Sequence, residues 1–87
     1  MEGLTEGRIV HYVLASGQSK GEHRPAIIVK NWNNPNTPGM VNLQVFTDNQ
    51  NDYYPPGVPG SNGHMWATSV HHSEGKEPGT WHWIEKA

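Results

Sequence analysis

The chain has 87 residues, of which only 15 are Leu, Ile, Val or Phe, and its formal net charge is −2. This length supports one domain, residues 1–87, with one small hydrophobic core. The slight acidity argues against bulk binding of nucleic acid or of an anionic membrane, which needs a basic surface. A core this small needs support from aromatic packing, self-association, a bound ligand or a histidine-based metal site, since there is no cysteine for a disulfide.

No segment predicts export or insertion into a membrane. The apolar runs, such as residues 9–10 and 26–29, are far shorter than the roughly 20 residues that span a bilayer. Residues 1–7 are acidic and rich in glycine, whereas a signal peptide begins basic and continues apolar. We therefore expect a cytoplasmic protein that has no membrane partner.

Ten glycines and seven prolines divide the chain into short segments that leave no room for ordinary helices. Five segments have the β-branched and aromatic content or the alternation of strands. They are residues 8–14, 26–32, 40–47, 65–71 and 81–86. We predict an all-β fold, a small antiparallel five-stranded barrel or sandwich of the SH3-like or a related kind.

Alternation within these segments assigns residues to the two faces of the sheet. The inward positions of the first and third segments are Val10, Tyr12, Leu14, Val41, Leu43 and Val45. In the fourth segment Trp66 shares a face with Val70, and in the last Trp81 and Trp83 share the face opposite His82. Tryptophan on a strand more often packs in a core than binds a ligand, and we expect this above all for Trp66.

Residues 48–64 (DNQNDYYPPGVPGSNGH) form a predicted loop with almost no aliphatic content. Loops of this length are uncommon in compact domains and are often functional. Tyr53 and Tyr54 lie in this loop, where there is less core for them to enter. They are therefore the first aromatic candidates for a binding site.

The segments VNLQVFTD, WATSV and GTWHW, at residues 41–48, 66–70 and 79–83, carry a resemblance. Over nearly its whole length the chain resembles a family of short, mostly uncharacterised proteins encoded by tailed bacteriophages and prophages. The resemblance implies a viral accessory protein that acts in the cytoplasm of the host bacterium, and it brings no established catalytic residues. By analogy of size and setting, such a protein could act as a sponge for a nucleotide immune signal.

A nucleotide-type ligand needs an aromatic surface for its base and hydrogen-bond donors for its phosphates. Tyr53, Tyr54 and Trp83 offer the aromatic surface, Arg24 offers the donors, and His82 adjoins Trp83. We predict that these residues bind and sequester a small anionic nucleotide-type ligand in a homo-oligomer, without catalysis and without a cofactor.

Other interpretations stay open at this stage. Arg24 could instead form an ion pair with Glu22 or with a neighbouring copy of the chain. The protein could be a structural or host-protein-binding module of a phage that acts through an exposed aromatic face. Residues 7–10 and 21–29 also resemble the start of growth-inhibiting toxin ribonucleases with an SH3-like barrel, but residues 30–32 (KNW) stand where those enzymes carry a catalytic Ser or Thr.

Six histidines are a large share of this chain. His71 and His72 are adjacent, so in a strand they point to opposite faces, and no HxH or HExxH motif is present. A site that combines His64 with one of these two and a carboxylate is conceivable. Ordinary surface positions account for the histidines more simply, and we predict no metal site.

Overall fold

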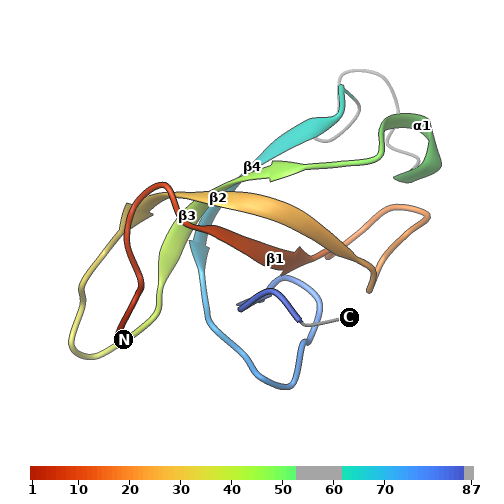
Figure 1. Ribbon diagram of the computed structural model, residues 1–87. Helices are drawn as coiled ribbons and strands as arrows, with labels where there is room; N and C mark the ends of the chain where they lie inside the picture. The colour runs from red at the N-terminus through yellow and green to blue at the C-terminus, as the bar shows by residue number, and fades with distance from the viewer. Residues whose placement is uncertain (53–61, 86–87) are drawn as a thin grey trace.

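The computed structural model describes residues 1–52 and 62–85, which form a five-stranded antiparallel sheet of order β4-β3-β2-β1-β5 (Figure 1). The strands are β1 (Ile9–Val13), β2 (His23–Asn31), β3 (Val41–Phe46), β4 (His64–Val70) and β5 (Trp81–His82), and one helical turn, α1 (Asn49–Asp52), follows β3. The prediction of a small all-β fold with five antiparallel strands is confirmed. In the described part of the chain, no helix is long and apolar enough to cross a membrane.

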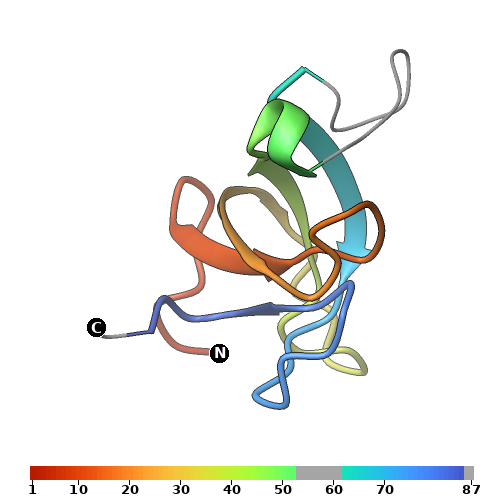
Figure 2. The same ribbon diagram turned by 90° about the vertical axis from the view of Figure 1, so that its right-hand side faces the viewer.

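The sheet is curved but does not close into a barrel. β1 to β4 follow one another as a meander, and β5 returns to pair with β1 (Figure 2). The two edges approach at an isolated parallel bridge between His72 and Trp81, where the Trp81 amide donates to the His71 carbonyl at 3.0 Å. This return brings the end of the described chain beside its first strand.

The core lies on one face of the sheet and includes the predicted inward residues. Val10, Leu14, Val41, Leu43 and Val45 are fully buried, and Tyr12 is nearly so. Trp81 is also fully buried, and its indole N–H donates to the Gly39 carbonyl at 2.7 Å, which satisfies the polar atom of this large ring. The alternation therefore located most of the core correctly, and Trp81 has the core role.

β2 begins three residues earlier than predicted and includes Pro25. The Ile28 amide donates to the Arg8 carbonyl on the β1 side, so the nitrogen of Pro25, three positions away, faces the β3 side. β3 ends near this point, because Ala26 pairs with Val45 one residue before the end of the strand. Pro25, which has no amide proton to donate, therefore lies where few hydrogen bonds between β2 and β3 remain to be made.

The core position predicted for Trp66 is wrong, because its side chain is 48% exposed. Trp66 pairs with Gln44 on the outer face, and the register between β3 and β4 shifts after this point. Ser69 has a φ of 53°, in the left-handed region, so the strand departs from strict alternation there. As a result, Ala67 and Val70 are buried three positions apart, and Trp66 faces outward.

Candidate metal centre

Three histidines from three neighbouring strands lie on the face of the sheet opposite the core. His11 of β1 is the register partner of His82 of β5, so the two side chains project from the same face. His23 of β2 pairs with Val13, two residues along β1 from His11, and therefore shares this face. The ring centroids are 4.6 Å apart for His23 and His82 and 5.8 Å apart for His11 and His82.

Glu85 completes the cluster from the segment that follows β5. Its Oε2 lies 3.1 Å from His11 Nδ1, its Oε1 lies 2.8 Å from His23 Nδ1, and Oε1 also contacts His82 Nε2. One ligand atom from each of the four residues lies within 4.8 Å of the other three. The fold therefore gathers three imidazole nitrogens and one carboxylate oxygen around a single point.

His82 is the most unusual member of this cluster, because it is only 1% exposed. Among the described residues, neither ring nitrogen of His82 has a hydrogen-bond partner of acceptable geometry. Leaving a buried donor or acceptor unsatisfied costs about 1–3 kcal/mol, so such a group needs an explanation. The expectation of ordinary surface histidines fails at this position.

The ionisation of the cluster follows from burial and from its mutual contacts. Burial lowers the pKa of His82, although the carboxylate of Glu85 works in the opposite direction. Burial raises the pKa of Glu85, but the hydrogen bond from His11 and the charges of His82 and His23 outweigh it, and the pKa falls to about 2. Near neutral pH Glu85 is therefore an ionised carboxylate.

The donor set matches a transition-metal ion better than Mg²⁺ or Ca²⁺. Imidazole suits zinc, copper, nickel and iron, whereas Mg²⁺ and Ca²⁺ take oxygen ligands. Four protein ligands are the complement of a tetrahedral zinc site, in which metal–ligand distances near 2.0–2.1 Å place the ligand atoms roughly 3.4 Å apart. His11, His23, His82 and Glu85 could hold such an ion if the widest pair of ligand atoms closes by about 1.4 Å and the contacts of Glu85 Oε1 with His23 and His82 open to the spacing of a tetrahedral site.

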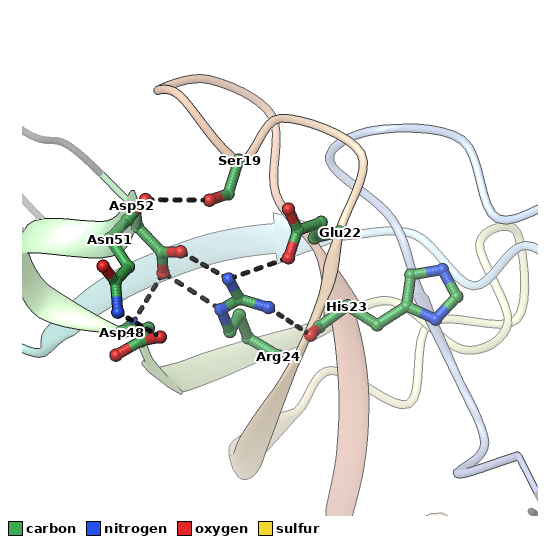
Figure 3. Close-up of polar contacts among 7 residues, drawn as sticks. All are labelled: Ser19, Glu22, His23, Arg24, Asp48, Asn51 and Asp52. Atoms are coloured by element: carbon green, nitrogen blue, oxygen red, sulfur yellow. Dashed lines mark hydrogen bonds and ion pairs between the residues drawn. The ribbon is translucent and has the colours of Figure 1, made fainter.

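Arg24, predicted as a phosphate-binding residue, is engaged in an ion pair with Asp52 of α1 (Figure 3). Its Nε donates to Asp52 Oδ2 at 3.0 Å, and its Nη2 contacts both Asp52 Oδ1 and, at 3.2 Å, Glu22 Oε1. Asp52 is fully buried and also accepts the Asp48 amide. The hydrogen bonds from Arg24 lower the pKa of Asp52 and raise that of the guanidinium, so both groups stay charged.

Among the described residues, His82 does not share a site with Arg24. Arg24 pairs with Tyr12 on the core face, whereas His82 lies on the opposite face with His11. Trp83 is partly buried, packs edge-on against Trp81 and lies under the guanidinium of Arg8 at 5.3 Å. Tyr53 and Tyr54 lie outside the described residues.

The histidine cluster was missed because sequence spacing does not show it. His11 and His82 are far apart in the chain, and neither belongs to a short metal-binding motif. One signal was present: each histidine alternates with a predicted core residue, which places both on an outer face. Comparison with models of known protein families, with curated proteins and with solved structures finds no match, so function is argued from this geometry.

Proposed function

We propose that this protein binds a transition-metal ion of the zinc class through His11, His23, His82 and Glu85. The observation that carries the proposal is the burial of His82 inside a cluster of three further metal-ligating side chains. Among the described residues its Nδ1 has no hydrogen-bond partner, and its Nε2 lies against the Glu85 carboxylate. A metal ion would use one of these nitrogens and would bind the carboxylate that already lies against it. This proposal replaces the prediction, made from sequence spacing, that no metal site exists.

The proposed role of the ion is to fasten the carboxyl-terminal segment to the sheet. β5 has only two residues, and the chain leaves the sheet after His82. Two of the four ligands, His82 and Glu85, come from this segment, and the other two come from the hairpin of β1 and β2. His11 and Glu85 are 74 residues apart, and a metal clip that closes a long loop brings a large entropic stabilisation.

The proposed role is structural and not catalytic. Four protein ligands fill a tetrahedral coordination sphere, whereas a catalytic zinc keeps one position open for water or substrate. A small domain with a limited core is also where a structural metal contributes most. A phage accessory protein in the host cytoplasm remains the setting that we predict from the sequence.

The test is a zinc titration of protein that has been treated with a chelator. We expect one ion per chain, and Co²⁺ should give the visible absorption of a tetrahedral complex. At 100 times the dissociation constant, binding stabilises the native state by about 2.7 kcal/mol, which corresponds to a rise in Tm of roughly 10–20 °C for a domain of this size.

A matched pair of variants makes this test specific. His23→Asn removes a ligand and should abolish most of the zinc-induced rise in Tm. His64→Asn removes an exposed histidine outside the cluster and should leave that rise unchanged. Absence of one-to-one binding by the unmodified protein, or an equal rise in Tm for both variants, would reject the proposal.

A further inference from the structure

A lysine already lies at the carboxylate that the proposed ion would use. Lys76 Nζ is 3.6 Å from Glu85 Oε1, and the side chain of Lys76 is 41% exposed. The same oxygen also contacts His23 and His82. Lys76 therefore places a fixed positive charge beside the point where the ligand atoms converge.

The backbone around Lys76 is held in a tight turn between β4 and β5. Lys76 has a φ of 58°, a left-handed conformation that residues other than glycine adopt infrequently. Its amide donates to the Ser73 carbonyl at 3.3 Å, and the Ser73 hydroxyl contacts Glu77 across the turn. The turn thus fixes where the lysine side chain starts, and the side chain reaches from there to Glu85.

We propose that Lys76 is the residue that limits the metal affinity of this site, and this inference rests on the proposed function. Its ammonium group neutralises Glu85 when no ion is bound, and an incoming ion competes with it for the same oxygen. A divalent ion placed among the four ligands would lie within a few ångströms of the ammonium group and repel it. Metal binding therefore requires Lys76 to turn away into solvent.

The expected effect has the opposite sign from that of a ligand substitution. Removing the charge of Lys76 removes a competitor of the ion, so the variant should bind zinc more tightly than the unmodified protein. Exposed ion pairs and screened charges contribute little binding free energy. We therefore expect the zinc dissociation constant to fall by only about three- to tenfold. The gain should shrink in high salt, because salt screens the repulsion.

The experiment measures zinc dissociation constants by calorimetry at low ionic strength for the full chain. Lys76→Gln should bind zinc about three- to tenfold more tightly, and Lys76→Arg, which keeps the charge, should match the unmodified protein. Lys20→Gln is the control, because Lys20 is exposed in the loop before β2 and is not part of the cluster. Lys76→Asn is a second neutral variant, because asparagine tolerates the left-handed conformation.

The possible failures can be told apart. If the unmodified protein binds zinc but both neutral variants bind it equally or more weakly, the role of Lys76 is refuted and the metal site stands. If neither the unmodified protein nor any of these variants binds zinc, the proposed function is wrong and this inference is refuted with it.

Discussion

Replacing Arg24 by methionine separates a structural role of this residue from a ligand-binding one. Methionine keeps much of the length of the side chain and removes the guanidinium. Asp52 would then remain buried with the Asp48 amide, at 2.6 Å, as its main remaining donor. The structure predicts that the chief consequence is a loss of folding stability.

The size of the loss follows from the burial of the pair. Removing one partner of a buried ion pair typically costs about 3–5 kcal/mol, because the other charge stays uncompensated. Asp52 is fully buried but the Arg24 side chain is 16% exposed, so we expect a lower figure, about 2–4 kcal/mol. For a domain of this size, that loss lowers Tm by roughly 10–25 °C.

Urea unfolding followed by tryptophan fluorescence measures this loss directly. Glu22→Gln is the matched control, since Glu22 is a partner of the same guanidinium but its side chain is 62% exposed. Its substitution should change the free energy of unfolding by less than about 1 kcal/mol. A double-mutant cycle with Asp52→Asn should show strong coupling to Arg24→Met.

The pH dependence gives a second measurement of the same pair. The folded-state pKa of Asp52 lies below its unfolded value, because Arg24 donates hydrogen bonds to the carboxylate. The pair therefore stabilises the fold fully above the unfolded pKa, about 3.9, and this contribution is lost as the pH falls below that value through the folded pKa. Arg24→Met should weaken this acid-dependent loss. A variant as stable as the unmodified protein at neutral pH would refute the structural role of Arg24.

Three further predictions concern the core, the outer face and the expected ligand. Leu43→Ala should cost about 2–4 kcal/mol in urea unfolding, because Leu43 is fully buried, whereas Trp66→Gln should change stability by less than about 0.5 kcal/mol. The outer face exposes Ile9, Phe46 and Trp66, so sedimentation should show self-association that Trp66→Gln weakens; a strict monomer at all concentrations would contradict this. Sequestration of a nucleotide-type ligand predicts a rise in Tm with cyclic dinucleotides or ADP-ribose derivatives, and no shift with any of them would count against it.

The sequence by itself determined the number of strands and most of their buried faces, although the last strand, predicted over residues 81–86, is only Trp81–His82. Val41, Leu43 and Val45 alternate with polar residues, and a period of two has only one simple interpretation in an extended chain. The same local pattern failed for Trp66, because Ser69 adopts a left-handed conformation that shifts the following residues relative to their partners. An irregularity of this kind depends on how neighbouring strands pack and pair, and it cannot be read from the sequence.

The candidate metal centre was decided by the tertiary structure alone. Alternation along the strands predicts that His11 and His82 point away from the core. Their position opposite each other depends on the pairing of β1 with β5. This pairing is set by how the curved sheet buries Trp81 and returns the end of the chain to its beginning. The separation of Arg24 from His82 has the same origin, because residues on opposite faces of a sheet cannot share a site however well their chemistry matches.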